Sequence, residues 1–287
     1  MSMASSISPE RVALLFRKAD QVLVKLPSGL EAQSVHSFRT TTRRLQTLLQ
    51  QLTTDRNRNQ KKVLKMLDRI RRRAGKVRDL DVQLGALRTL KVPQEPRRKT
   101  QLMHSLIELR GKQERKLSKE LNKSDVREIR KRLKRAAKDL TIDSNVDPLG
   151  VARQMVAKVE RPGGAFTEEV LHQYRAVVKR ARYAAEFADN SPESAELIAN
   201  LKRLQDAIGH WHDWLTLSQT ATKRLGAVNH SSLVAALNTV TRGKFRQAVA
   251  ALSASPAVPA QISQRQPQKR NAATENAADL ELVETAA

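Results

Sequence analysis

Two segments of the 287-residue chain repeat one pattern, and this repeat limits the possible folds more than any other feature. The first reads VHSFRTTTRR and the second LHQYRAVVKR, so that a histidine heads each segment and cations follow three, seven and eight residues later. The two histidines, His36 and His172, lie 136 residues apart. Residues spaced by three and four share one face of an α-helix. The pattern therefore predicts two related helices.

An apolar stripe runs beside the basic one in both predicted helices. On a helical wheel each apolar stripe spans a sector about 80° wide, which is typical of the core-facing side of a bundle helix. The apolar positions are Val35, Phe38, Thr42, Leu45, Leu49 and Leu52 in the first copy and Leu171, Tyr174, Val178, Ala181, Ala185 and Ala188 in the second. The basic stripes contain His36, Arg39 and Arg43 in the first copy and His172, Arg175, Lys179 and Arg182 in the second. Each helix is therefore predicted to pack on one side and to meet an anion on another.

A second pair of segments extends the repeat beyond one helix. LDRIRRRAGKVRDLDV aligns with LKRLQDAIGHWHDWL when Gly75 is placed on Gly209, and Asp79 then falls on Asp213. The separation from histidine to aspartate is 43 residues in one copy and 41 in the other. The two aspartates are expected to be buried or half-buried partners that hold the arginines in place. Two helices repeated at nearly equal spacing are typical of a duplicated structural unit.

The duplication and the helical period together predict an all-α chain of two pseudo-symmetric helical bundles, each a four-helix unit. The helical domain is predicted to span residues 1–252, with halves at about 8–145 and 146–252. Residues 253–287 are predicted to be a disordered tail, because their composition cannot build a core. Breakers separate the expected helices, which lie at about Pro9–Leu26, Glu31–Leu52, Gln60–Leu90, Arg97–Leu121, Ser124–Leu140, Pro148–Val159, Thr167–Ala188, Ala195–Arg224 and His230–Leu252.

The charge of the chain indicates the class of its partner. Lys and Arg number 53 against 29 Asp and Glu, which gives a formal net charge of +24. Such an excess predicts a polyanionic partner, either nucleic acid, an anionic membrane surface or a phosphate polymer. The chain has no cysteine, which excludes disulfides, thiolate metal sites and cysteine nucleophiles. The opening residues lack a signal-peptide pattern and no apolar run approaches about 18 residues, so we expect a cytoplasmic protein.

The predicted third helix carries cations on the side opposite its apolar stripe. Those cations are Lys61, Lys65, Arg69, Arg72 and Lys76. Like charges four residues apart repel each other mildly on a helix, and the basic stripes lack acidic residues at the usual compensating positions. This repulsion is explained if an anion occupies a groove beside the repeated helices.

Common catalytic and cofactor motifs are absent, since the chain has no GxxxxGK[ST], GxGxxG, HExxH or EF-hand pattern. In the segment HWHD, His210 and His212 point about 160° apart on a helix, so they are not expected to share a metal ion. Trp211 and Trp214 are interpreted as core residues. The sequence therefore predicts no catalytic residue, no metal and no cofactor.

The repeated segments resemble the CHAD family, the conserved histidine α-helical domain. The resemblance rests on VHSFRTTTRRLQTLL with RAGKVRDLDV and on LHQYRAVVKRARYAAEF with LQDAIGHWHDW, and it covers roughly residues 8–252. It implies two four-helix bundles around a basic central channel, binding of inorganic polyphosphate, and association with polyphosphate granules. The chain departs from the pattern at Lys179, where an arginine-like residue is expected, and at His212, which stands where the first copy has Arg78.

The residues and the resemblance together predict a non-catalytic module that binds inorganic polyphosphate. Arg and Lys suit this ligand because they form charge-assisted hydrogen bonds with phosphate oxygens. The expected binding residues are His36, Arg39, Arg43, Arg44, Arg69, Arg72, Arg73, Lys76, Arg78, His172, Arg175, Lys179, Arg180, Arg182, Lys202 and Arg203. Whether the two histidines donate to phosphate or only to neighbouring side chains stays open.

Three alternative functions are also open. The first is a nonspecific nucleic-acid-binding helical protein. Proteins that bind single strands stack the bases on aromatic side chains, and the chain has only nine Phe, Trp and Tyr residues for this, so binding would rest on the backbone phosphates. An enzyme acting on phosphate polymers would need carboxylates that converge on a divalent cation, and Asp79, Asp81 and Asp213 are dispersed in the sequence. A peripheral binder of anionic lipid would need a large apolar edge beside its basic face, which these helices lack.

Overall fold

The computed structural model describes residues 6–53, 56–92, 95–143, 145–161, 164–226 and 231–258. Across these ranges the chain is built of helices and has no strand, apart from one isolated antiparallel bridge between Ile7 and Ala188. The all-α fold class is therefore confirmed. No helix in these ranges is long and apolar enough to cross a lipid bilayer.

The observed helices correspond one to one with the expected helices, and their ends differ by at most three residues. They are α1 (Pro9–Lys25), the 3₁₀ helix η1 (Leu26–Ser28), α2 (Ala32–Gln51), α3 (Arg58–Thr89), α4 (Pro96–Lys119), α5 (Lys123–Lys138), α6 (Pro148–Ala157), α7 (Glu168–Ala185), α8 (Pro192–Leu225) and α9 (Ser232–Ser253).

Side-chain caps fix where the long central helices begin. At the start of α3, Asn57 and Gln60 form a capping box, in which each side chain accepts a hydrogen bond from the backbone N–H of the other residue. Ser191 and Ser194 form the same arrangement at the start of α8, and Pro192 occupies the first helical position. Proline is favoured there because its missing N–H has no intrahelical partner to lose. These caps explain why α8 begins three residues earlier than the sequence predicts.

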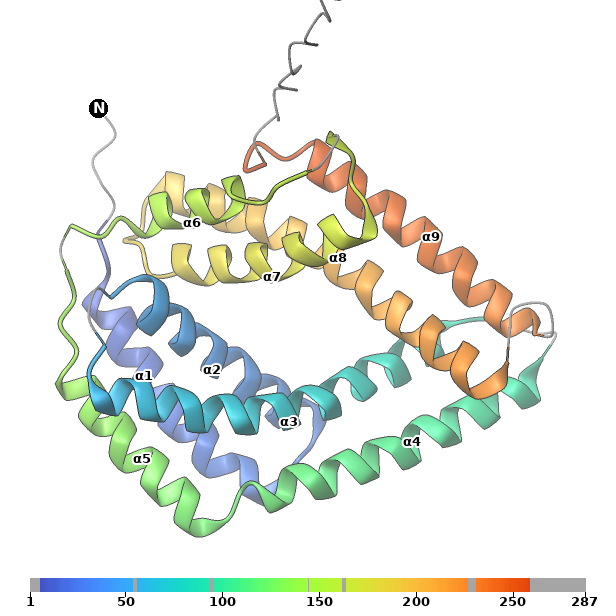
Figure 1. The fold of residues 1–287 in the computed structure, drawn as a ribbon, viewed down its shortest axis with the longest axis horizontal. Helices are drawn as coiled ribbons and strands as arrows, with labels where there is room; N and C mark the ends of the chain where they lie inside the picture. Colours follow the sequence, from blue (N-terminus) through green and yellow to red (C-terminus); the bar gives the residue numbers. More distant parts are fainter. Residues whose placement is uncertain are drawn as a thin grey trace, which may run out of the picture.

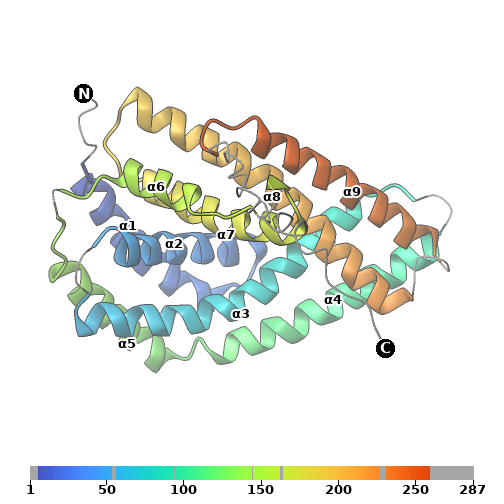
Figure 2. The same cartoon turned by 45° about the horizontal axis from the view of Figure 1, so that its top comes forward.

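The two repeated helix pairs pack against each other in the middle of the molecule. Helix α2 contacts α3 and α7, and α8 contacts α7 and α3, so the four helices form a continuous set (Figure 1). Helices α1 and α5 lie on the outer side of the first pair, whereas α6 and α9 pack on the second. Figure 2 shows α4 running beside α3. This arrangement brings the basic stripes of α2 and α7 close together.

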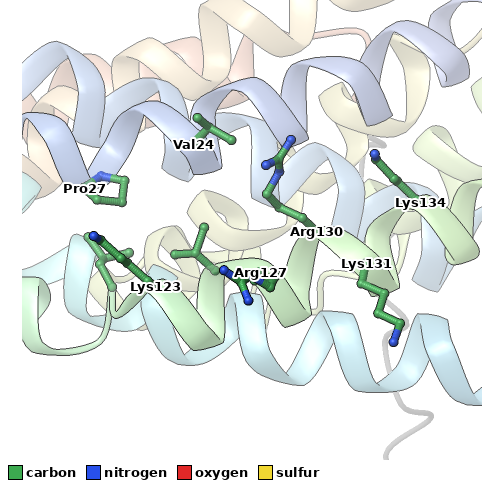
Figure 3. A pocket seen from close by; sticks show the side chains of 9 residues that line it. Val24, Pro27, Lys123, Arg127, Arg130, Lys131 and Lys134 are labelled. Carbon is green, nitrogen blue, oxygen red and sulfur yellow. The ribbon is translucent and has the colours of Figure 1, made fainter.

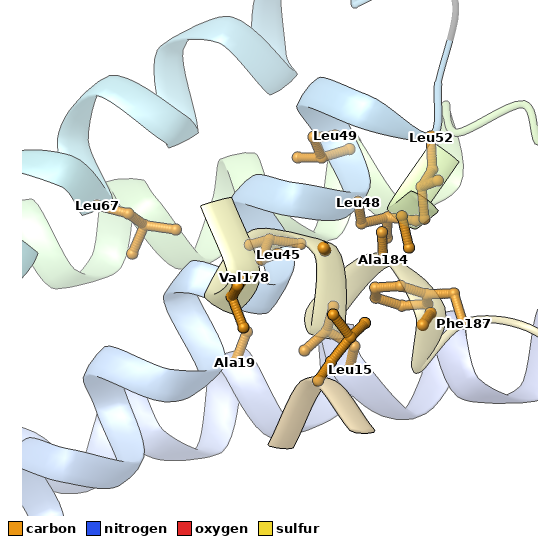
Figure 4. Close-up of a cluster of buried hydrophobic side chains, with 14 of the residues drawn as sticks. Leu15, Ala19, Leu45, Leu48, Leu49, Leu52, Leu67, Val178, Ala184 and Phe187 are labelled. Atoms are coloured by element: carbon orange, nitrogen blue, oxygen red, sulfur yellow. The ribbon is translucent and has the colours of Figure 1, made fainter. Parts of the chain in front are cut away.

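The hydrophobic core is shared between the halves of the chain. Leu45 of α2 and Val178 of α7 belong to one cluster of buried side chains, which also includes residues of α1, α3, α5, α6, α8 and α9 (Figure 4). A second cluster joins the far ends of α3, α4, α8 and α9, with Leu87 and Leu237 among its buried members. The expected boundary near residue 145 therefore does not separate two cores, and the pseudo-twofold relation of the halves stays a prediction.

The first residues of the predicted tail belong to the packed body. Ala257 and Val258 are partly buried against the larger core cluster, just beyond the end of α9. The backbone N–H of Val258 donates to the carbonyl of Ser255 at 3.1 Å, which closes a turn there. The expectation of disorder is therefore wrong for residues 253–258, because aliphatic side chains within them reach the core. The remainder, residues 259–287, lies outside the described residues.

Candidate anion-binding site

Five cations from three helices meet at the centre of the molecule. Arg39 and Arg43 come from α2, Arg71 from α3, and Arg175 and Lys179 from α7. All five are half-buried, and burial followed by the charges of the neighbouring cations lowers the pKa values of Arg39, Arg43 and Lys179. We call these residues the central basic cluster. The sequence predicted four of its members.

Arg39 is held against the backbone of α3. Its Nη1 donates a hydrogen bond to the carbonyl of Arg71 at 3.1 Å. This contact depends on Gly75, because a Cβ atom at that position would overlap Nη1 of Arg39. Burial lowers the pKa of Arg39 to about 10, and the nearby charges of Arg43 and Arg175 act in the same direction. Gly75 thus provides the space in which a buried guanidinium crosses from α2 to α3.

Lys179 shows how crowded the positive charge is. Burial first, and then the charges of Arg175, Arg43 and Arg39, lower the pKa of Lys179 from 10.5 to about 7. Asp213 of α8 acts in the opposite direction without compensating for them. Burial and nearby positive charge both disfavour the protonated form of a lysine, and both act on Lys179. An anion placed in the cluster would restore that proton.

Most of this positive charge is not neutralised by neighbouring side chains. Among the described residues, only Arg71 of the cluster forms an ion pair, with Asp68 of the same helix. The Nε atom of Arg175 is buried and has no hydrogen-bond partner there. A buried, unpaired donor is unfavourable unless a ligand satisfies it. The cluster therefore carries uncompensated positive charge and an unsatisfied buried donor.

The two repeated aspartates lie near the cluster but do not pair with it within the described residues. Asp213 is half-buried as expected, and burial raises its pKa. Asp79 is exposed, so the prediction that it is buried or half-buried is wrong. The charge of Asp79 nevertheless raises the pKa of Arg39. The helix pattern could not separate these cases, since both positions follow the aligned glycine by four residues.

Arg44 and Arg182, both predicted to bind anions, pair with Glu186 at the end of α7 instead, so Arg44 links α2 to α7 whereas the pair of Arg182 lies within α7. Arg44 Nε lies 2.6 Å from Oε2 of Glu186, and Arg182 Nη1 lies 3.3 Å from Oε1 of the same carboxylate. Both guanidinium groups also lie over the ring of Tyr183, at 5.2 and 5.0 Å from its centroid. Such cation–π contacts add to the ion pairs. Arg44 thus holds α2 against the end of α7, and Arg182 supports the same carboxylate from within α7.

The predicted binding residues on the outer side of α3 do not reach the cluster. Arg69 Nε lies 2.8 Å from Glu120, and Arg69 Nη2 lies 2.6 Å from Asp125, so this side chain fastens α3 to the junction of α4 and α5. Arg73 also pairs with Glu120, at 3.5 Å, and Arg72 pairs with Asp68, at 3.2 Å.

Three further predicted cations also lie apart from the cluster. Lys76 is exposed on the outer side of α3. On α8, Lys202 lies 2.5 Å from Asp206, and Arg203 hydrogen bonds to Asn200. The structure therefore brings together only part of the predicted set.

The histidines lie at the edge of the cluster. His36 is exposed, and its pKa is lowered by partial burial and then by the charges of Arg78 and Arg39. The His172 ring lies 4.9 Å from the Trp211 ring, measured between centroids. His212 lies beside them, and burial followed by the charge of Arg175 lowers its pKa to about 3, which keeps it neutral at physiological pH. Direct contact of either repeated histidine with a ligand stays a prediction.

A polar groove opens beside the cluster. It has a volume of about 190 Å³ and is lined by residues of α2, α3 and α7. Cluster members Arg43, Arg71 and Lys179 line it, and Gln46 and Arg180 add further hydrogen-bond donors. The groove therefore offers several donors to the oxygens of a polyanion. Within the described ranges, no three potential ligand side chains lie together in a way that could hold a metal ion.

Arg71 is the cluster member that the sequence reasoning missed. Cations lie on several faces of α3 between Arg69 and Arg78, so the charge pattern alone does not show which side of this helix faces α2. Gly75 could have identified the face of α3 that meets α2, because Arg71 precedes it by four residues and Arg78 follows it by three. Residues at these spacings share a helix face. Since Gly75 leaves space for the guanidinium of Arg39, the face of α3 that contains it is the face toward α2.

A family model and a solved structure both point to the CHAD domain. The family model described as the CHAD domain matches residues 13–222. The crystal structure of the CHAD domain from the plant Ricinus communis is similar, with a TM-score of 0.63, 14% identity, and coverage of 91% of this chain and 97% of that one. A structure of PptA from Streptomyces chartreusis has a TM-score of 0.55 and 15% identity, and covers 86% of this chain and 96% of that one. No curated protein matches the chain.

Proposed function

The chain belongs to the CHAD domain family, and from that premise we propose that it binds inorganic polyphosphate through the central basic cluster without changing it chemically. The observation that carries this proposal is the partly buried set of cations around Lys179, whose pKa burial and the charges of Arg175, Arg43 and Arg39 together lower to about 7. A polyanion would relieve their mutual repulsion. We also propose, from the family resemblance, that the protein acts in the cytoplasm in association with polyphosphate granules.

Polyphosphate suits the cluster for physical reasons. The polymer carries about one negative charge per phosphate and has no bases, so it needs cationic donors and no stacking platform. Arg39, Arg43 and Arg175 offer planar guanidinium groups, which bind phosphate oxygens in pairs. Release of counterions from the polymer would supply much of the affinity, as it does for nucleic acids.

The binding residues are proposed from their position relative to the cluster. The five cluster cations form the inner contacts, while Arg78, Arg180, His36 and His172 lie at the rim. Arg44 links α2 to the end of α7 through Glu186, and Arg182 pairs with the same carboxylate from within α7. The outer cations of α3 and α8 are assigned to helix packing and to the surface.

Nonspecific binding of nucleic acid is the competing function. The excess of positive charge would attract any polyanion. Trp211 and Tyr174, however, are buried, with exposed fractions of 0% and 1%, and Trp214 is half-buried against the second core cluster. Base stacking, which strengthens binding of single strands, therefore has little support from these residues. Polyphosphate is the ligand that needs only the charges the cluster provides.

Hydrolysis of a phosphate polymer would require carboxylates that converge on a divalent cation. Of the three aspartates considered from the sequence, Asp81 forms an ion pair with Arg110 of α4. The Nε atom of Arg110 lies 2.7 Å from Oδ1 of Asp81. Asp79 and Asp213 lie beside cations instead. We therefore propose binding without turnover, and release of phosphate in the presence of Mg²⁺ would contradict it.

A competition titration tests the proposal. Long-chain polyphosphate, DNA, RNA and orthophosphate are titrated at matched total charge and fixed ionic strength, and polyphosphate should bind tightest. The double variant Arg39→Gln with Arg175→Gln should weaken binding at least tenfold. The variant Lys61→Gln with Lys65→Gln removes the same charge from the exposed side of α3 and serves as the matched control. Equal losses in both double variants would show a diffuse charge effect and reject the site.

A further inference from the structure

A second basic surface lies away from the central cluster, between α1 and α5. It is a pocket of about 610 Å³, within the range of ligand-binding cavities. Its apolar side is formed by Val24 of α1, Pro27 of η1 and Val126 of α5 (Figure 3). Five cations of α5 line the other side, namely Lys123, Arg127, Arg130, Lys131 and Lys134. We call this site the α1–α5 pocket.

The apolar side of the pocket is open to solvent. Val24 is 44% exposed, which makes it one of the most exposed large aliphatic side chains of the described residues. Pro27 beside it is also exposed, and Val126 is half-buried. Aliphatic side chains of a partner would gain free energy by covering these groups. A ligand made only of phosphate would not.

The cationic side of the pocket is poorly compensated. Arg130 pairs with Asp20, its Nε lying 2.7 Å from Oδ1. Lys123, Arg127 and Lys131 are exposed and form no ion pair within the described residues. They follow one another at intervals of four residues, at which like charges on a helix repel each other. The pocket therefore matches a partner that combines carboxylates with aliphatic side chains.

One segment of this chain has that composition. Residues 271–287 contain four acidic residues and neither lysine nor arginine. Within them the stretch DLELVE places Asp279, Glu281 and Glu284 among the aliphatic residues Leu280, Leu282 and Val283. These residues lie outside the described part of the chain. Their charge and their aliphatic content complement the two sides of the α1–α5 pocket.

The connecting chain is long enough to reach the pocket. Twenty residues separate Val258, the last described residue, from Asp279. Fully extended, they span roughly 70 Å, whereas a compact body of this size has a diameter of roughly 45 Å. We propose that the acidic segment of residues 275–284 docks in the α1–α5 pocket. Its aliphatic residues cover Val24 and Pro27, and its carboxylates pair with the free cations of α5.

The absence of native cysteine allows a distance measurement on the full-length chain. Nitroxide labels are attached at Ser124→Cys, at the start of α5, and at Thr285→Cys, beside the acidic segment, and their separation is measured by pulsed electron paramagnetic resonance. Docking should give a narrow population at short distance. Dilution with unlabelled protein should leave that population unchanged if the segment docks on its own chain and reduce it if a second copy supplies the segment.

Two sets of variants decide the outcome. Arg127→Gln with Lys131→Gln, and separately Leu280→Ser with Val283→Ser, should each reduce the short-distance population several-fold. Lys112→Gln with Lys116→Gln, an exposed pair on α4 with the same spacing, is the matched control and should have no effect. One broad distribution shared by all variants would overturn the proposal. So would loss of binding to anionic vesicles in the α5 variant when the distances do not change, because the pocket would then be a lipid site.

Discussion

Replacing Lys179 with methionine should stabilise the ligand-free protein at acidic pH. Burial, together with the charges of Arg175, Arg43 and Arg39, lowers the pKa of Lys179 from 10.5 to about 7. Below pH 7 the folded protein must carry this ammonium group in an unfavourable place, whereas the unfolded chain carries it in water. Methionine has a similar length and no charge, so the variant removes the unfavourable term and keeps much of the packing.

The size of the effect follows from the shift in pKa. Between pH 7 and 10.5 the unfolded chain retains a proton on Lys179 that the folded chain has released. The free energy of unfolding therefore rises with pH in this window, by about 1.4 kcal/mol per unit. Below the window the full penalty applies, on the order of 5 kcal/mol. Raising the pH from 7 to 9 should recover about 2.7 kcal/mol of it.

Urea denaturation of the wild type and of Lys179→Met at pH 6 and pH 9 measures this effect. The variant should be the more stable protein at pH 6, and its advantage should shrink by about 2.7 kcal/mol at pH 9. Taking the difference between the two proteins removes the titration of all other groups. Lys65→Met, on the exposed side of α3, is the control and should show no such pH-dependent difference. If wild type and Lys179→Met respond equally to pH, the cations are not crowded and the reasoning fails.

Three other changes should have distinct results. Gly75→Ala should displace the guanidinium of Arg39 and weaken polyphosphate binding about tenfold in a fluorescence titration. Gly209→Ala is the control and should not weaken binding, because a Cβ there meets open space. Glu186→Gln should lower the free energy of unfolding by about 1–3 kcal/mol in urea, because it unpairs two arginines at the joint of α2 and α7; an unchanged midpoint would show that this joint is unimportant. Truncation after Leu252 should lower the melting temperature further than truncation after Val258 does, and equal melting temperatures of the two truncated chains would contradict the packing of the intervening residues.

The helices could be predicted from the sequence because the relevant signals are local. The 3-4 spacing of apolar residues in α2 and α7 gave their buried faces, and prolines and glycines marked their ends. The start of α8 was placed too late because Ser191 and Pro192 have the same residue types in a turn and in a helix cap. The arrangement of the halves was harder to predict, since an apolar stripe does not show which other stripe it packs against.

The site was predictable on α2 and α7, where one basic stripe lies beside one apolar stripe. It was not predictable on α3, because cations occur on several faces of that helix between Arg69 and Arg78. Only tertiary contacts separate Arg69, which pairs with Glu120, from Arg71, whose carbonyl accepts a hydrogen bond from Arg39. A helical wheel contains no information on where acidic residues of other helices will lie.

The central claim is that both copies of the repeated helix contribute to one polyanion site. Titration of long-chain polyphosphate into Arg39→Gln with Arg43→Gln, and into Arg175→Gln with Lys179→Gln, tests it most directly when several salt concentrations are used. Each double variant should bind roughly ten- to a hundredfold more weakly and show a shallower dependence of log K on log salt, because each loses two phosphate contacts. A double variant that binds long chains as tightly as the wild type, with the same salt slope, would show that its helix takes no part and would contradict the account.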